Sequence, residues 1–204
     1  MKSHYFTVSG NGESLFKEKG SKFIGCAFGV SSPDEIEQRL MDVRKIYHDA
    51  RHHCYAWVLG QDQESYRAND DGEPGHSAGD PILGQIRSKG LTNCLVVVVR
   101  YFGGTKLGVS SLIQAYRAAA DEALMHAGKK KIAIEKTIEI AYPYESTSTI
   151  MRMVDQYNIS IVNQQFDASC LLVGKIGVAE LEFFESELDL LEKTGSKINC
   201  KLID

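Results

Sequence analysis

The segment DDGEPGHSAGDPI, residues 70–82, gathers side chains that could do acid–base or metal chemistry. Its first seven residues hold three carboxylates, from Asp70, Asp71 and Glu73, and the imidazole of His76. Such groups at close range can transfer protons or hold a divalent cation. The same residues also suit a stiff turn, because Asp-Gly bends the chain and Glu-Pro extends it. The spacing matches no zinc motif such as HExxH, so the residues alone favour the turn.

Two further imidazoles, His52 and His53, lie upstream in ARHHCYAW at residues 50–57. They could complete a cluster with the acidic segment only if the two segments converge in space. Cys54 follows His53 directly, but neighbouring residues of a strand face opposite sides. The serines of the other motifs lack a GxSxG context, so no nucleophile has an identifiable base: Ser77, Ser110 and Ser111.

The segment RYFGGTKLGVSS, residues 100–111, follows a strongly apolar run and leads into a helical pattern. A strand-to-helix junction can bind phosphate through free N–H groups and the helix dipole. The segment is neither a P-loop nor a GxGxxG motif, so Gly103 and Gly104 can equally serve a tight turn. Both readings stay open. The aromatic pair Tyr101 and Phe102 is expected in the core rather than on a base-stacking surface.

The elements that must position these residues begin with strands at 5–9 and 22–30, which are expected to pair. Ser32 as N-cap, Pro33 and an apolar stripe predict an amphipathic helix over 32–47. The nearly all-apolar CLVVVVRYF predicts a central strand covered on both faces. The other expected elements of this part are a strand at 54–60, a short helix between 80 and 90, and a long helix over 109–127.

From residue 136 onward the pattern becomes strand, helix, strand, strand, helix, strand. This order in about 70 residues is typical of a ferredoxin-like domain, with two helices on one face of an antiparallel sheet. We therefore predict an α+β protein of two domains, residues 1–133 and 134–204, with the boundary near residues 131–136.

Charge is divided unequally between these parts. Residues 1–135 carry 17 Lys and Arg against 16 Asp and Glu, whereas residues 136–204 carry 6 against 11. An acidic second part repels phosphate, so nucleic-acid contacts are expected in the first. The five cysteines are scattered and odd in number, and no apolar run reaches the ~20 residues of a membrane span. We expect a cytoplasmic protein without a cofactor, a tightly bound metal or a membrane partner.

Three motifs, RHHCYAW, DDGEPGHSAGDPIL and VVVRYFGGTKLG followed by LIQAYRAA, resemble those of the YigZ/IMPACT family in order and separation. The resemblance covers about residues 15–127, and the tail is similar to the bacterial branch by pattern. It implies a first domain with a left-handed βαβ fold, similar to domain IV of elongation factor G and to ribosomal-protein domain-2-like folds. The tail would then resemble domain V of that factor. Ser110 and Ser111 depart from the glycine pair usual in bacterial members.

Eukaryotic members of that family regulate translation through protein–protein binding, so the resemblance implies a translation-linked binding protein. Its partner would be the ribosome, RNA or a translation-regulating protein, and the oligomeric state is open. The alternative is a small metal-assisted hydrolase using the His, Asp and Glu side chains. A nucleotide-binding relative of small-molecule kinases would need a fuller glycine-rich loop.

A surface shaped by the three motifs is the predicted binding site, because binding residues concentrate on loops held by a rigid scaffold. Its members are Arg51, His52, His53, Asp70, Asp71, Glu73, His76, Arg100, Tyr101, Gly103, Gly104 and Lys106. None of them is assigned a catalytic role. If RNA is the partner, we expect its cationic contacts to come from Arg51, Arg100, Lys106 and the run at 129–131.

Overall fold

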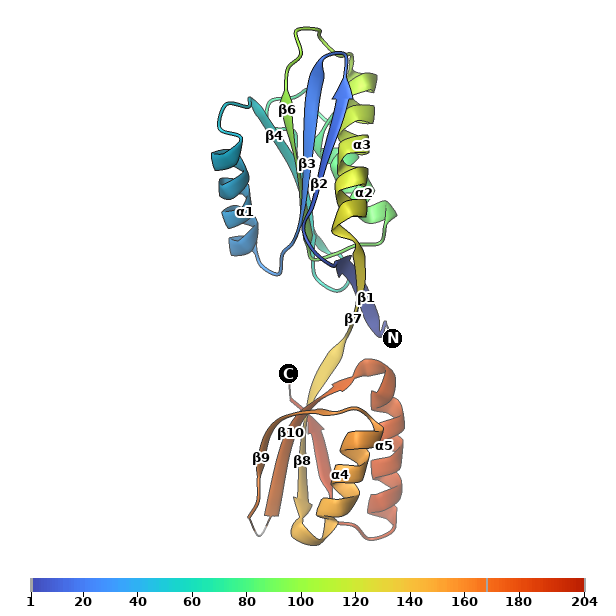
Figure 1. Cartoon of the computed structure of the whole chain (residues 1–204). Helices are drawn as coiled ribbons and strands as arrows, with labels where there is room; N and C mark the ends of the chain where they lie inside the picture. Colours follow the sequence, from blue (N-terminus) through green and yellow to red (C-terminus); the bar gives the residue numbers. More distant parts are fainter. Residues whose placement is uncertain (1, 168, 204) are drawn as a thin grey trace. The chain divides into compact units, whose positions relative to one another are not determined.

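The computed structural model describes residues 2–167 and 169–203, and it has the expected mixed α+β architecture (Figure 1). The chain divides into two compact units. The first runs from Tyr5 to Ile132, and the second comprises the residues up to His4 together with those from Ala133 onward. Independent folding of two domains that meet at residues 131–136 stays a prediction, which limited proteolysis can test.

A five-stranded antiparallel sheet in the order β2-β3-β6-β4-β5 forms the centre of the first unit. The expected central strand is confirmed, because β6 is paired on both sides and buried on both faces. Val96 and Val98 face one core and Val97 and Val99 face another. The strands are β2 (Gly12–Glu18), β3 (Ser21–Gly29), β4 (His52–Leu59), β5 (Ser65–Asn69) and β6 (Cys94–Tyr101).

Helices cover both faces of this sheet (Figure 1). On one face lies α1 (Pro33–Ile46), which is capped as expected by Ser32, whose side chain accepts from the Glu35 N–H. On the other lie α2 (Gly79–Ser88) and α3 (Val109–Ala127). The buried face of α3 is rich in alanine, so its backbone approaches β2 and β3 closely: a Cβ on Gly25 would lie 2.5 Å from the Ala119 carbonyl oxygen.

The expected pairing of the first two strands is wrong. β1 (His4–Val8) pairs with β7 (Lys129–Ala133) in a two-stranded sheet, whereas β3 pairs with β2 and β6. The sequence reading missed β2, β5 and β7, which carry many polar residues. The lysine run at 129–131 lies in β7.

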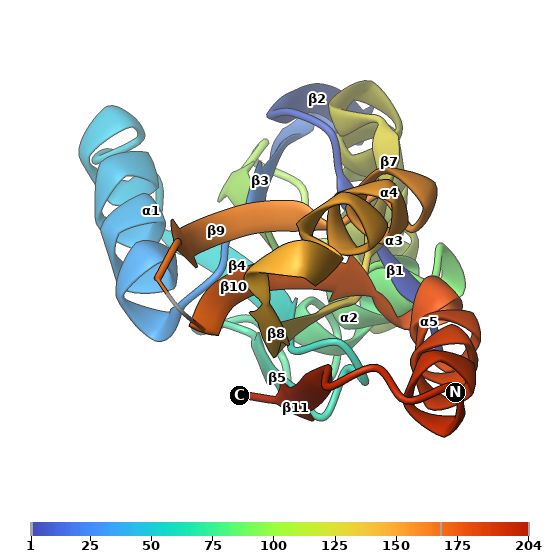
Figure 2. The ribbon, with the colours of Figure 1, turned by 90° about the horizontal axis from the view of Figure 1, so that it is seen from below.

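The second unit confirms the ferredoxin-like prediction. Its elements are β8 (Glu135–Pro143), a 3₁₀ turn η1 (Tyr144–Ser146), α4 (Thr147–Gln156), β9 (Ser160–Gln165), β10 (Ser169–Gly177), α5 (Val178–Lys193) and β11 (Asn199–Leu202). The sheet order is β11-β8-β10-β9, with every pair antiparallel. Both helices pack on one face, around Ile138, Ile140 and Phe184 (Figure 2). No helix among the described residues is long and apolar enough to cross a membrane.

Candidate functional site

The acidic segment forms a loop, residues 70–78, between β5 and α2, which we call the motif loop. Its Asp70 carboxylate accepts hydrogen bonds from the backbone N–H groups of His76 (2.9 Å), Ala78 (2.9 Å) and Gly79 (2.8 Å). Burial raises the pKa of Asp70, but these bonds outweigh it and hold the pKa below its usual value. Asp70 therefore acts as the cap of α2, whose first N–H groups have no partner within the helix.

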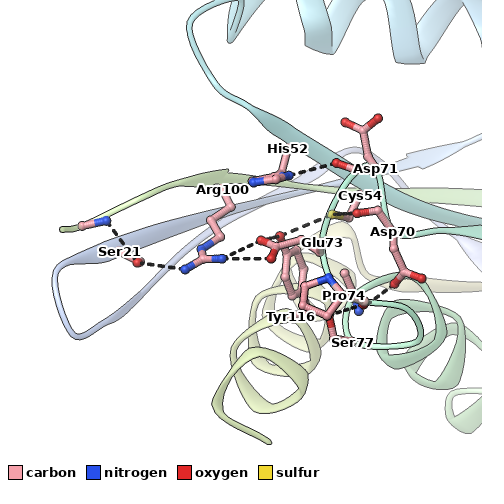
Figure 3. A network of polar contacts seen from close by, with 12 residues as sticks. Ser21, His52, Cys54, Asp70, Asp71, Glu73, Pro74, Ser77, Arg100 and Tyr116 are labelled. Carbon is pink, nitrogen blue, oxygen red and sulfur yellow. Dashed lines mark hydrogen bonds and ion pairs between the residues drawn. The ribbon is translucent and has the colours of Figure 1, made fainter. Parts of the chain in front are cut away.

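Asp71 ties the motif loop to the start of β4. Its Oδ2 accepts the His53 N–H at 2.7 Å, and its carbonyl oxygen lies 2.9 Å from His52 Nδ1 (Figure 3). A carbonyl oxygen only accepts, so His52 Nδ1 carries the hydrogen of this bond and donates it to Asp71. Asp71 and Gly72 both have positive φ, at 39° and 85°. Residues 70–72 thus form a stiff, internally bonded turn.

His53 points away from His52, as expected for neighbours on a strand. Its side chain is buried, and Nε2 lies 3.1 Å from the carbonyl oxygen of Tyr47, to which it donates. Burial lowers the pKa of His53, so the ring is neutral at pH 7. His53 therefore belongs to the support of the site and not to its exposed surface.

Glu73 lies in a buried ion pair with Arg100 of β6 (Figure 3). Arg100 Nη1 lies 2.7 and 3.0 Å from the two carboxylate oxygens, and the Tyr116 hydroxyl donates to Oε1 at 2.8 Å. The side chains of Arg100 and Glu73 are only 7% and 4% exposed. The pair joins the motif loop to the centre of the sheet, and either charge left alone there would be strongly unfavourable.

The Cys54 thiol belongs to this network and is not a free nucleophile. It donates to the Asp70 carbonyl oxygen at 3.0 Å and lies 3.3 Å from the Tyr116 hydroxyl. Burial raises the pKa of Cys54. A protonated, fully buried thiol lacks the thiolate character that reactive cysteines need.

His76 is separated from the groups above. Its side chain is 87% exposed, and Nδ1 lies 2.6 Å from Oδ2 of Asp80, in the first turn of α2. This hydrogen bond raises the pKa of His76. The ring lines a cavity of about 480 Å³ with Asp80, Gln85 and Arg117, and that cavity includes neither His52 nor Arg100.

A second cavity, of about 500 Å³, lies where β4 begins and β6 ends, and we call it the basic pocket. Its lining comprises Asp49, Ala50, Arg51, His52, Arg100, Tyr101, Phe102 and Lys106. The structure therefore brings together five of the twelve predicted surface residues here: Arg51, His52, Arg100, Tyr101 and Lys106.

The charges of the basic pocket are unevenly neutralised. Arg51 and Lys106 are exposed, and neither side chain has an ion pair or hydrogen bond with any residue that the structure describes. Asp49 Oδ1 accepts the Tyr101 hydroxyl at 2.6 Å, which lowers the pKa of Asp49 and raises that of Tyr101 to about 12. The pocket therefore offers two free cations and one carboxylate that is ionised at neutral pH.

The expectation that Phe102 lies in the core is wrong, because 57% of this residue is exposed. Asp49 and Phe102 are the lining residues of the basic pocket with polar or aromatic side chains that the sequence reading left out. Phe102 directly follows the last residue of β6 and precedes the Gly103–Gly104 turn, so it lies outside the buried strand. Its position directly after the strand is the sequence feature that could have indicated exposure of the ring.

The glycine turn after β6 is built for close packing. The Gly103 N–H donates to Ser21 Oγ at 3.2 Å, and a Cβ at Gly103 would lie 1.9 Å from the Gly20 carbonyl carbon. Gly104 has φ of 85°. The Gly103 N–H is therefore not free for an anion, and the tight-turn reading accounts for the pair. Ser110 and Ser111 lie in the first turn of α3.

The lysine run at 129–131 contributes no side chain to the basic pocket. Lys129 Nζ donates to the Lys89 carbonyl oxygen at 2.6 Å and lies 4.2 Å from the centre of the Phe6 ring. Within residues 2–167 and 169–203, no three or more His, Cys, Asp or Glu side chains are grouped so that they could hold a metal ion.

The fold places the chain among two-unit α+β proteins, and in this chain the motif loop is bonded to Arg100, which lines the basic pocket of the first unit. The Impact N-terminal domain family matches residues 19–124. YigZ of Escherichia coli, an IMPACT family member, is 32% identical over 174 residues, which cover 83% of this chain and 84% of that protein. The chain therefore belongs to the IMPACT family.

Two further comparisons agree with this assignment. YvyE of Bacillus subtilis, another IMPACT family member, is 39% identical over 128 residues, or 63% of this chain and 59% of that protein. A solved structure described as the crystal structure of a hypothetical protein superimposes with a TM-score of 0.72 at 26% identity, covering 100% of this chain and 99% of that one. The shared architecture thus extends over both units.

Proposed function

We propose that this protein is a translation-linked binding protein whose first unit contacts ribosomal or other RNA through the basic pocket. One observation carries the proposal: the carboxylates of the motif loop are used in internal bonds, whereas Arg51 and Lys106 have no partner among the described residues. Unpaired cations on a rigid scaffold suit a phosphate-bearing partner. The family resemblance supplies the link to translation.

The distribution of charge supports this location. Arg100 is neutralised by Glu73, so Arg51 and Lys106 provide the free positive charge of the basic pocket. The second part of the chain, with 6 basic and 11 acidic residues over 136–204, opposes a polyanion at long range. A translation-linked role also implies a cytoplasmic location.

The hydrolase alternative has less support. Its general-base candidates Asp70 and Asp71 accept backbone N–H groups, and Glu73 is held by Arg100 and Tyr116. A carboxylate used in this way is a weak base for chemistry. No observation of the site favours hydrolysis over binding.

The test compares two double variants of equal charge change. R51A/K106A removes the free cations of the basic pocket, and K17A/R67A removes exposed cations from the edge strands β2 and β5. Sedimentation with ribosomes and filter binding of single-stranded RNA across a salt series are measured for both. We expect R51A/K106A to lose binding and to lower the log–log salt slope by about 1.4, at about 0.7 for each lost phosphate contact.

The matched variant should bind like the wild type. Equal loss in both double variants would contradict the assignment to the basic pocket, because it would indicate a general effect of net charge. Recovery of a partner from lysate that survives ribonuclease treatment and does not need Arg51 or Lys106 would favour a translation-regulating protein instead of RNA.

A further inference from the structure

We propose that the basic pocket holds one nucleotide of single-stranded RNA, with the phosphate at Arg51 and Lys106, the base on Phe102 and a ribose hydroxyl at Asp49. This inference rests on the proposed function and specifies its ligand. A volume of about 500 Å³ is within the range of small-ligand sites. The three kinds of group that line the pocket match the three parts of a nucleotide.

The phosphate is assigned to the side of the free cations. Arg51 and Lys106 are exposed and lack partners among the described residues, so they can close on an anion without breaking an existing ion pair. Arg100 also lines the pocket, and its Nε is buried without a hydrogen-bond partner in the described part of the chain. A buried donor of this kind indicates an unfilled contact, which a ligand or water can satisfy.

The base is assigned to Phe102. This ring is 57% exposed and lines the pocket together with the aromatic ring of Tyr101. Its centre lies 5.8 Å from the Arg100 guanidinium carbon, and Glu73 fixes that guanidinium, so the ring has a rigid neighbour. Stacking on an exposed aromatic ring strengthens binding by about ten- to a hundredfold for each base.

The ribose is assigned to Asp49. Its Oδ1 accepts the Tyr101 hydroxyl, and as an ionised carboxylate it retains further acceptor capacity and cannot donate. A carboxylate repels phosphate but accepts from a ribose 2′-hydroxyl, as in other nucleotide sites. Because DNA lacks that hydroxyl, Asp49 should favour RNA over DNA. A bare phosphate or an acidic peptide would leave both Asp49 and Phe102 unused.

The experiment measures fluorescence anisotropy of the full chain with a labelled RNA hexamer, a DNA hexamer of the same base order and an RNA hexamer with abasic sites. F102A should weaken RNA binding about ten- to a hundredfold. F102Y should bind within about twofold of the wild type, because it keeps a ring for stacking. The matched control is Y66A, because Tyr66 is also exposed and lies under an arginine, Arg87, but on β5 outside the basic pocket. It should leave binding unchanged.

D49N tests the sugar contact. We expect it to improve DNA binding through lost repulsion and to lower the RNA-to-DNA affinity ratio. The matched control is D62N, which neutralises an exposed carboxylate outside the basic pocket and should leave the RNA-to-DNA affinity ratio unchanged. Melting curves of each variant check that it is folded, and F102L replaces F102A if the latter is not.

The results separate this inference from the proposed function. Equal binding of intact and abasic RNA, together with wild-type affinity of F102A, would overturn the inference, as would equal wild-type affinities for RNA and DNA. Salt-dependent binding that R51A/K106A abolishes would still support the proposed function in those cases. Absence of binding to RNA and to ribosomes by the wild type would overturn both.

Discussion

The motif loop and the basic pocket are neighbouring regions rich in charged side chains, but they differ in whether those charges are already paired within the protein. In the motif loop, Asp70, Asp71 and Glu73 all bind groups of the protein itself. In the basic pocket, Arg51 and Lys106 have no partner among the described residues. Arg100 belongs to both, because its charge is held by Glu73 while it lines the pocket. The motif loop, although rich in carboxylates, thus stabilises the site, whereas the cations of the basic pocket are available to bind a partner.

The largest expected effect comes from breaking the buried pair at its centre. E73A leaves the Arg100 guanidinium buried without its counter-ion and should lower the free energy of unfolding by about 3–5 kcal/mol. E73Q keeps an acceptor for Tyr116 and should cost less. Chemical denaturation measures both, with E64A as the control because Glu64 is an exposed acid on the preceding segment. A wild-type stability for E73A would show that the loop is not held by this pair.

The glycine turn allows a comparison between two adjacent residues, one closely packed and one open to solvent. In G103A the new Cβ meets the Gly20–Ser21 backbone, so we expect a loss of about 2–3 kcal/mol, at the upper end for overpacking. G104A meets nothing within 4 Å and carries only the strain of its positive φ, about 1 kcal/mol. Thermal melting of the two neighbours decides the order. The reverse order would contradict the close packing of Gly103.

Removing the Asp70 cap of α2 should cause the next largest loss of stability. D70A removes the acceptor for three N–H groups and should cost about 1–2 kcal/mol, whereas D62A, at an exposed loop acid, should cost little. Because the pKa of Asp70 is lowered in the folded state, its contribution is complete above the unfolded value near 3.8. It is lost as the pH falls through the folded value. The stability difference between D70A and the wild type should therefore shrink in acid, and a difference that grows would contradict this role.

Some elements of the fold were predictable from the sequence and others were not. The apolar run of β6, the capped helix α1 and the whole ferredoxin-like unit were predictable, because their patterns are strong and local. β2 and β5 were missed, since edge strands carry polar residues that weaken the alternating signal. The pairing of β1 with β7 depends on residues more than 120 positions apart, which no local pattern reveals.

For the site, residue types were predictable but their roles were not. The motifs named Arg51, His52 and Lys106, and the structure places all three in the basic pocket. The spacing of the motif does not show whether Glu73 is buried or exposed. Its burial depends on the ion pair with Arg100, 27 residues along the chain. Phe102 was assigned to the core from its type alone, although the turn after it exposes the ring.

The smallest effect is expected at His76 and Asp80, the exposed pair at the outer edge of the motif loop. The hydrogen bond to Asp80 raises the pKa of His76, so its contribution to stability is present below the unfolded value near 6.5 and is lost as the pH rises through the folded value. Both side chains are largely exposed, and H76A should therefore lower stability less than E73A, G103A or D70A. NMR titration of the His76 ring should give a raised pKa in the wild type and a lower one in D80N. An ordinary pKa in the wild type would show that the pair does not persist in solution. A large loss of stability in H76A would show that His76 stabilises the fold as the buried residues of the motif loop do.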